Sequence, residues 1–172
     1  MSMIKENPQI VQGQSEDTKQ KEMFEAMRKR LSAYRTLNEE IDNEIERLDR
    51  MQMKATSVGG SNFTGMPKSP SPVYDRMADA VARIIDLETE IKKLVKQRDD
   101  ERKSIEALVK LLDKAGERAI IRSRYLDLED WEDVLFVLFG GKSDFDDKYD
   151  EYKQRMFRWH RSAITNLAQL SY

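Results

Sequence analysis

The residues of the sequence best suited to bind a ligand lie in a basic stretch near its C-terminal end. Four cations, Lys153, Arg155, Arg158 and Arg161, fall within nine residues that contain no acid. Lysine and arginine neutralise phosphates, and arginine also pairs with guanine edges through two hydrogen bonds. A solvated basic face on a packed helix is the alternative. The residues expected to contact DNA are Lys153, Gln154, Arg155, Arg158, His160 and Arg161.

The apolar residues around this stretch predict the helix that positions it. They recur in steps of three and four, and this spacing would bury one face and leave Gln154, Arg158 and Arg161 outside. A shorter apolar helix over 131–139 and the pair Gly140–Gly141 precede it, as in a helix-turn-helix. The apolar positions of the last helix are Tyr152, Met156, Trp159, Ala163 and Leu167.

Other kinds of chemistry find little support. The single histidine, His160, lacks the partners of a zinc site or a Ser-His-Asp relay, and the absence of cysteine removes thiolate ligands and thiol nucleophiles. The acids between Asp144 and Asp150 fail the calcium-loop pattern because Lys148 takes the fifth position and no glycine follows. We expect no enzyme activity and no catalytic, cofactor-binding or metal-binding residue.

Composition predicts an all-α protein of one or two small units. The 172 residues are 36% charged and 39% hydrophobic, which is enough for one modest core. A net charge of −2 means that a nucleic-acid footprint must come from local asymmetry. The sequence has no apolar run of 18 residues and no signal-peptide pattern, so we expect neither a membrane segment nor export.

The order of the chain predicts two long helices before the C-terminal unit. Residues 1–16 are expected to be a flexible tail, and helices over 17–56 and 73–115 flank a Gly/Pro/Ser loop at 57–72. Heptad-like steps predict a coiled-coil hairpin or dimer, with the polar Asn38 fixing register. We expect Ile41 and Ile45 to lie in the dimer interface.

The C-terminal unit is expected to span residues 117–172. Gly116 is expected to end the second long helix, a short helix is predicted over 118–126, and Ser143 with Asp146 has capping-box spacing. Both tryptophans, Trp131 and Trp159, are expected in the core. The helix over 131–139 is apolar nearly all round and needs a cover. The residues expected to contact a protein partner there are Phe136, Val137 and Phe139.

Several short stretches resemble a family of phage and prophage proteins of Firmicutes. The family is similar in layout to the RinA and ArpU late-transcription regulators and ends in a helix-turn-helix like that of sigma-factor region 4. The resemblance rests on Gly65-Met66-Pro67 in the loop, on Arg118 to Leu126 with its Arg-Tyr pair, on Trp131-Glu132, and on Arg158 to Ile164. It implies DNA binding and control of phage gene transcription. The coiled-coil pattern predicts a homodimer, and we expect the protein in the cytoplasm of a bacterial host cell.

The sequence departs from this family in two places. An acid-rich insertion over 141–151 precedes the recognition segment, where acids would repel phosphates. Phe136 and Val137 also stand where the family has polar residues. Two alternatives therefore stay open. One is a protein-interaction factor with a degenerate helix-turn-helix, which binds RNA polymerase, a repressor or a host defence protein. The other is a phage packaging or scaffolding protein.

Overall fold

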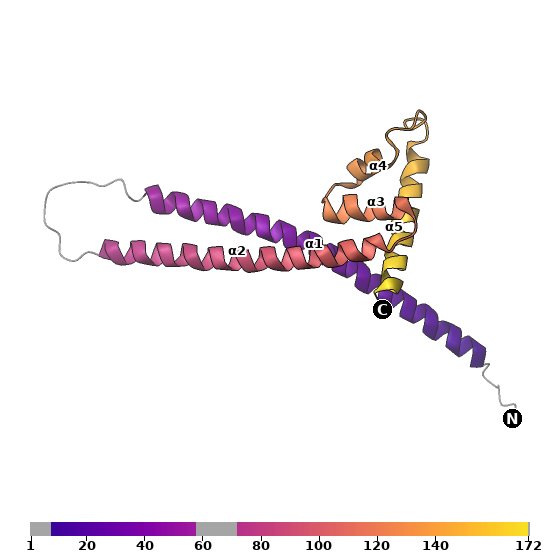
Figure 1. Cartoon of the computed structure of the whole chain (residues 1–172), viewed down its shortest axis with the longest axis horizontal. Coiled ribbons are helices and arrows are strands. Elements are labelled where there is room, and N and C mark those ends of the chain that lie inside the picture. Colours follow the sequence, from indigo (N-terminus) through magenta and orange to yellow (C-terminus); the bar gives the residue numbers. More distant parts are fainter. Residues whose placement is uncertain (1–7, 58–71, 172) are drawn as a thin grey trace, which may run out of the picture. The chain divides into compact units, whose positions relative to one another are not determined.

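The computed structural model describes residues 8–57 and 72–171, and these residues are helical apart from short turns (Figure 1). No strand occurs among them, so the all-α class is confirmed. None of the helices in these ranges is long and apolar enough to cross a membrane. The elements are α1 (Pro8–Ser57), α2 (Pro72–Lys110), α3 (Ala115–Ile121), the π-helical turn η1 (Arg122–Leu126), α4 (Trp131–Phe139) and α5 (Tyr149–Leu170).

The chain divides into two compact units. Unit 1 takes the described residues of Met1–Arg35 and Arg102–Tyr172, and unit 2 is Thr36–Glu101. The long helices α1 and α2 therefore each contribute residues to both units.

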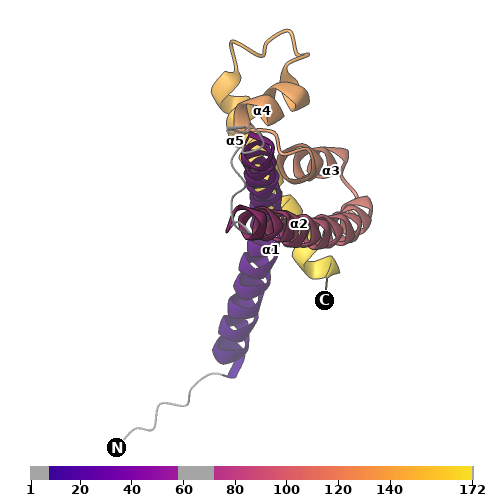
Figure 2. The same cartoon turned by 90° about the vertical axis from the view of Figure 1, so that its left-hand side faces the viewer.

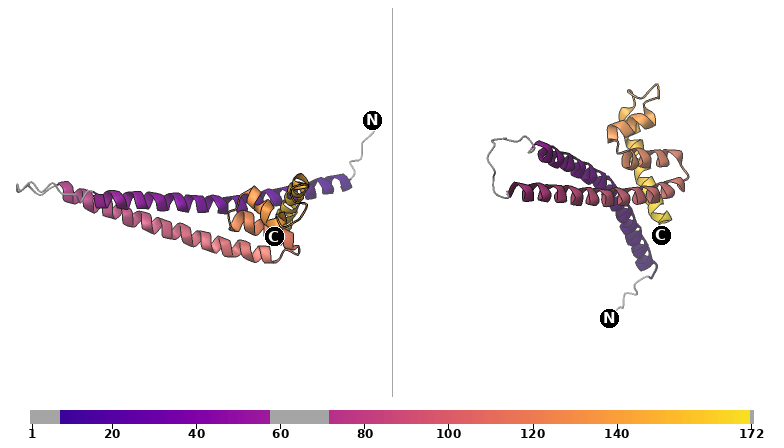
Figure 3. Two further views of the ribbon diagram at one scale, coloured as in Figure 1. Left: turned by 90° about the horizontal axis from the view of Figure 1, so that it is seen from above. Right: turned by 60° about the vertical axis from the view of Figure 1, so that its left-hand side comes forward.

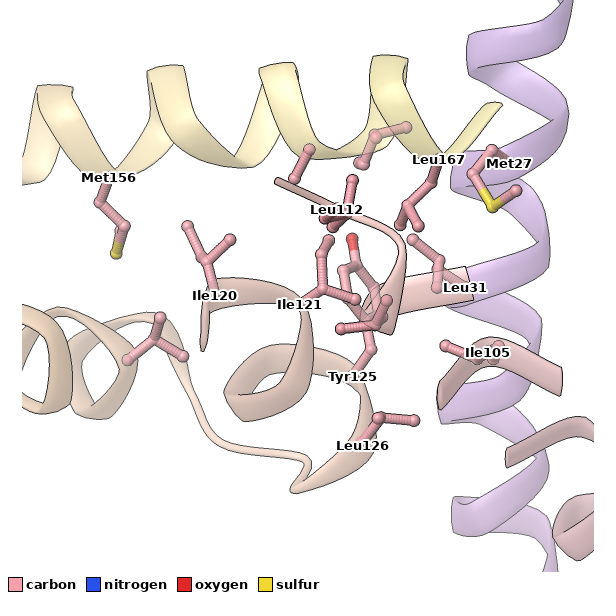
Figure 4. Packing of buried hydrophobic residues seen from close by; sticks show 14 of the residues in the cluster. Met27, Leu31, Ile105, Leu112, Ile120, Ile121, Tyr125, Leu126, Met156 and Leu167 are labelled. Carbon is pink, nitrogen blue, oxygen red and sulfur yellow. The ribbon is translucent and has the colours of Figure 1, made fainter. Parts of the chain in front are cut away.

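The core of unit 1 joins helices that lie far apart in the sequence. Figure 4 shows side chains of α1, the end of α2, α3 with η1, and α5 that point toward one another. Within this unit α5 packs against both α3 and α4 (Figures 1 and 2). Each buried aliphatic or aromatic side chain stabilises such a core by about 1.5 to 3 kcal/mol. Central members are Leu31, Ile105, Val109, Ile120, Ile121, Val134, Leu135, Met156, Ile164 and Leu167.

Unit 2 is a pair of helix segments. Figures 1 and 3 show α1 and α2 side by side through this unit, and the Gln52 amide donates a hydrogen bond to the Glu88 carboxylate at 3.4 Å. Ile41, Leu87 and Ile91 are buried. Ile45 is 40% exposed, so the expected interface pair Ile41 and Ile45 has one member buried within the chain and one at the surface.

The first long helix starts earlier than the sequence predicted. The expected flexible tail covered residues 1–16, but α1 is helical from Pro8, a residue type favoured in the first helical turn. The prediction is therefore wrong for residues 8–16, and residues 1–7 lie outside the described ranges. Residues 58–71 of the expected loop at 57–72 also lie outside them.

The prediction that Gly116 ends the second long helix is wrong. The helix α2 ends at Lys110, and Gly116 is the second residue of α3. A Cβ atom added at Gly116 would lie 2.5 Å from Cζ3 of Trp159. Close packing of an indole ring, and not a left-handed turn, accounts for the glycine.

The expected capping box of Ser143 and Asp146 is also wrong. Residues 140–148 form turns, and α5 begins at Tyr149 after Lys148, which makes no side-chain cap. The carboxylate that contacts α5 is Asp144, which accepts a hydrogen bond from the Tyr152 hydroxyl at 2.8 Å. The acid-rich insertion predicted at 141–151 therefore divides into this turn and the first residues of α5.

The expected helix over 118–126 corresponds to α3 and η1 together. The first four residues of this stretch are α-helical, and the next five form a π-helical turn. The amide of Asp127 donates to the carbonyl of Arg122 at 2.9 Å, a span of five residues. This wider turn brings Tyr125 and Leu126 into the core side by side.

Candidate nucleic-acid interface

The outward side of α5 carries the predicted basic residues. Lys153, Gln154, Arg155, Arg158 and Arg161 are all exposed, while the predicted apolar positions lie in or against the core. Residues 154, 158 and 161 share one face because they are spaced by four and three. No ion pair within the described ranges involves any of the four cations, so their charge remains open to solvent and to a ligand.

Two of these cations lie over aromatic rings of the same helix. The Lys153 ammonium is 5.8 Å from the Tyr149 ring centre, and the Arg155 guanidinium is 5.6 Å from that of Tyr152. Such contacts orient a side chain without neutralising its charge. Arg158 and Arg161 are oriented by no ring or acid in the described part of the chain.

The turn before α5 brings acids close to this basic face. Lys148 is 2.8 Å from Asp144, and hydrogen bonds from Lys148 and Tyr152 lower the pKa of Asp144. Asp146, Asp147 and Asp150 are exposed. Asp150 lies in the first turn of α5, where a negative charge interacts favourably with the helix dipole. Asp144 thus stabilises the turn through its hydrogen bonds, and the exposed acids make the electrostatic potential beside the basic face more negative.

The structure places His160 away from the outward face. Its Nε2 atom and the Tyr125 hydroxyl lie 2.9 Å apart and share a hydrogen bond. Its ring forms a T-shaped contact with Trp131, with 4.8 Å between centroids. Burial, and then the charges of Arg124 and Arg28, lower the pKa of His160 to about 4. His160 is therefore neutral at pH 7 and adds no cation to the predicted DNA-binding set.

Trp131 is half-buried, whereas the sequence predicted a core position. The Arg124 guanidinium lies 4.6 Å from its ring centre, and the Phe157 ring lies 5.1 Å away with a tilt of 57°. Phe157 is 41% exposed. The two rings thus form an aromatic pair at the surface of unit 1.

Two arginines fix the loop that leads into α4. Arg35 of α1 donates to the carbonyl of Glu129 at 3.3 Å, and Arg124 donates to the same carbonyl at 2.7 Å. Both also reach Oδ1 of Asp130, the residue before α4, at 3.2 and 3.3 Å. Leu128 adopts a left-handed φ of 63°, which is unusual for a branched side chain. These contacts set the position of Trp131.

A buried carboxylate joins α3 to α5. Glu117 is 1% exposed and accepts hydrogen bonds from Lys114 at 3.0 Å, Ser162 at 2.7 Å and Asn166 at 2.8 Å. Burial alone would raise its pKa, but the three hydrogen bonds outweigh burial and lower the pKa. This network fixes the rotation of α5 and hence the direction of its basic face.

The surface predicted for a protein partner is only partly exposed. Phe136 is 66% exposed and Val137 is 59% exposed, but Phe139 is buried between Tyr152 and Trp159. The prediction for Phe139 is corrected because its ring fills the chain's own core.

Two residues of this region escaped the sequence reasoning. Phe157 was passed over among the cations, although the spacing of Lys153, Phe157 and Arg161 in steps of four places an aromatic residue between two charges. Glu117 looked like an ordinary acid at a helix start. Its partners Ser162 and Asn166 are 45 and 49 residues away in sequence, and no local pattern indicates them.

Comparison of the chain with protein-family models, with curated proteins and with solved structures found no match.

Proposed function

We propose that this protein is a DNA-binding transcriptional regulator of the phage type, with α4, the turn at 140–148 and α5 acting as a helix-turn-helix. The observation that carries the proposal is the exposed basic face of α5. From Lys153 to the end of α5 no acid occurs, and no ion pair in the described ranges neutralises its cations. Phosphate contacts supply most non-specific affinity for DNA.

The arrangement of α5 suits the major groove of a duplex. Gln154, Arg158 and Arg161 lie on one face, and Arg and Gln form bidentate pairs with guanine and adenine edges respectively. Lys153 and Arg155 flank this face and would contact the phosphate backbone. Of the stretch Arg158 to Ile164, which resembles the end of a phage regulator's recognition helix, Arg158 and Arg161 belong to this face, whereas Ala163 and Ile164 are buried.

Titration of labelled duplex DNA tests this proposal by fluorescence anisotropy at several salt concentrations, starting at about 50 mM. Loss of a phosphate contact in Lys153→Ala should lower the salt slope by about one. Loss of a base contact in Arg158→Ala should reduce the binding free energy by about 1 to 3 kcal/mol for DNA sequences selected for tight binding, and should relax sequence specificity.

Arg83→Ala is the matched control, because Arg83 is an exposed cation of unit 2. It should leave duplex affinity unchanged. A wild-type chain that binds no duplex at about 50 mM salt would overturn the proposal.

Dimerisation is the second part of the proposal. We infer that α1 and α2 of unit 2 form a coiled-coil hairpin that pairs with a second copy. Ile45, Val81 and Ile85 support this inference, because they are exposed apolar side chains on helices that bury only one side of their surface. A two-fold dimer would present two α5 helices to two DNA half-sites.

A second candidate function is binding to a protein, and the exposed pair Phe136 and Val137 favours it. Two adjacent apolar side chains exposed on one short helix form a small docking surface. The partner would be RNA polymerase, a repressor or a host defence protein. A packaging or scaffolding role is the remaining alternative, and the extended helices of unit 2 would then build the assembly.

Phe136→Glu separates these candidates. Because Phe136 is mostly exposed, the change should preserve the circular-dichroism helix signal and duplex affinity while it abolishes binding to the protein partner. Leu170→Glu adds the same charge at another exposed apolar site and serves as the control. Unfolding of unit 1 by Phe136→Glu alone would show that the ring is structural.

A further inference from the structure

Phe157 is placed differently from the other apolar residues of α5. The core-facing residues Met156, Ala163 and Ile164 are fully buried, whereas Phe157 is 41% exposed. Its inner side rests against Trp131, with 5.1 Å between ring centres. The Arg124 guanidinium lies over the Trp131 ring, 4.6 Å from the ring centre. One side of the Phe157 ring therefore packs against an aromatic ring, and the other side is exposed to solvent.

Within one turn of Phe157 on α5 every charged residue is a cation, whereas the exposed acids Asp130, Glu132 and Asp133 flank its neighbour Trp131. Lys153 precedes Phe157 by one helical turn and Arg161 follows it by one turn, each about 6 Å along the axis. Arg158 is adjacent in sequence, and all three cations are exposed. The nearest acid on this side of α5 is Asp150, two turns before Phe157.

We propose that Phe157, supported by Trp131, is a stacking platform for an unpaired nucleobase of a single-stranded nucleic acid. Lys153 and Arg161 would neutralise the phosphates on the two sides of the stacked base. This inference rests on the proposed nucleic-acid function and names a second ligand form for the same helix. Proteins that hold single strands combine aromatic rings with a positive track in this way.

The exposed ring of Phe157 and the cations on both sides of it together indicate the kind of ligand. An apolar protein segment would match the ring but gain nothing from cations on both sides. A duplex would satisfy the cations but keep the faces of its bases stacked inside the helix, so that only base edges are accessible. A single strand supplies both a free π face and flanking phosphates. Phe157 also lies beside, and not on, the face of Gln154, Arg158 and Arg161 proposed for duplex contacts, although Arg161 would serve both ligands.

Anisotropy titrations with three labelled probes test the platform. The probes are oligothymidylate and oligouridylate of about 16 nucleotides and a duplex of mixed sequence. Phe157→Leu keeps an apolar contact with Trp131 but removes the π face, so it should fold as the wild type does, which its melting temperature checks. It should weaken binding of single strands about 5- to 150-fold and leave duplex binding unchanged. Phe157→Tyr should retain the wild-type affinity.

Phe136→Leu is the matched control, because Phe136 is the more exposed phenylalanine and has no cation within one turn of its helix. It should change no affinity. An equal loss in Phe136→Leu and Phe157→Leu would overturn the platform, as would a Phe157→Leu variant that binds single strands normally. If duplex DNA is bound but single strands are not, the platform fails and the proposed function stands. If no probe is bound at about 50 mM salt, both fail. Single-strand binding that is lost in Phe157→Leu supports the platform. If oligothymidylate is bound and oligouridylate is not, the ligand is single-stranded DNA. If both oligomers are bound, the ligand is single-stranded DNA or RNA.

Discussion

Gly116 of α3 lies directly against the indole ring of Trp159 on α5. A Cβ atom added at Gly116 would lie 2.5 Å from Cζ3 and 2.6 Å from Cε3 of that ring. Real Cβ atoms do not approach ring carbons this closely, so any larger residue would push α3 and α5 apart. The absence of a side chain here is thus a packing requirement of unit 1.

The first prediction is that Gly116→Ala destabilises unit 1. Helix propensity alone would favour alanine inside α3 by about 0.8 to 1.0 kcal/mol. Overpacking a core usually costs about 1 to 3 kcal/mol, and the indole has little room to move because Phe139 also packs on it. We expect a net loss measurable by urea denaturation. Gly141→Ala is the control, because a Cβ there meets nothing within 4 Å. A more stable Gly116→Ala variant would contradict the prediction.

The second prediction concerns His160 and pH. Its pKa is about 4 in the folded chain and about 6.5 in an unfolded one, so the unfolded state binds more protons between these values. Stability due to neutral His160 is therefore full above pH 6.5 and falls as pH drops toward 4. At pH 5 the loss should be about 2 kcal/mol relative to pH 7.

His160→Gln removes the titrating group and keeps a polar partner for Tyr125. Denaturation at pH 7 and pH 5 should therefore show a smaller decrease in the free energy of unfolding for His160→Gln than for the wild type. Equal decreases in the two proteins would mean that His160 titrates normally.

The third prediction tests the buried carboxylate. In Glu117→Gln one oxygen becomes an NH₂ group that faces the donors of Lys114, Ser162 and Asn166, which should cost about 1 to 3 kcal/mol. Folding lowers the pKa of Glu117, so its contribution is present above about pH 4.3 and disappears at lower pH.

The control for Glu117→Gln is Glu106→Gln, because Glu106 forms a solvent-exposed ion pair with Arg102. Such pairs contribute at most about 1 kcal/mol. If both substitutions have equal effects on urea unfolding at pH 7, the Glu117 network is no more important than a surface pair.

The fourth prediction tests association of the long helices. Ile45→Asp changes an exposed side chain and should shift the mass measured by light scattering from dimer to monomer with an unchanged helix signal. Ile41→Asp changes a buried side chain and should lower the helix signal as well. A wild-type chain that is already monomeric at tens of micromolar would rule out dimerisation at that concentration.

The fifth prediction concerns the acids of the turn. Changing Asp146, Asp147 and Asp150 together to Asn should tighten duplex binding, because exposed acids near the basic face repel phosphates. Changing Asp42, Asp49 and Asp86 to Asn alters the net charge equally but in unit 2, where all three are exposed. It should have a smaller effect. Equal effects would show that only total charge matters.

Local patterns predicted the helices well and their partners poorly. The bounds 131–139 followed from an apolar run, the acids at its start and the pair Gly140–Gly141 at its end. The buried side of α5 followed from apolar spacing. The apolar stripe of α1 looked like one coiled-coil seam. In the structure Met27, Leu31 and Tyr34 belong to the core of unit 1, whereas Ile41 is buried in unit 2. Spacing shows that a stripe is covered but not what covers it.

The candidate site shows the same division. Exposure of Lys153, Arg158 and Arg161 was predictable from helical phase. The neutral state of His160 was not, because it depends on Tyr125 and Arg124, which lie about 35 residues earlier. Glycine at 116 was assigned to a helix end on local preference, and only the position of Trp159 reveals its reason.

The π-helical turn η1 has a consequence for tracing the ancestry of this chain. Its bond from the Asp127 amide to the Arg122 carbonyl spans five residues, one more than an α-helix uses. A relative with an uninterrupted helix here would lack one residue between 122 and 127 and still place its counterparts of Ile121 and Leu126 in the core. An alignment that forbids a single-residue gap inside a helix would shift the register of α4 and α5 and conceal the kinship.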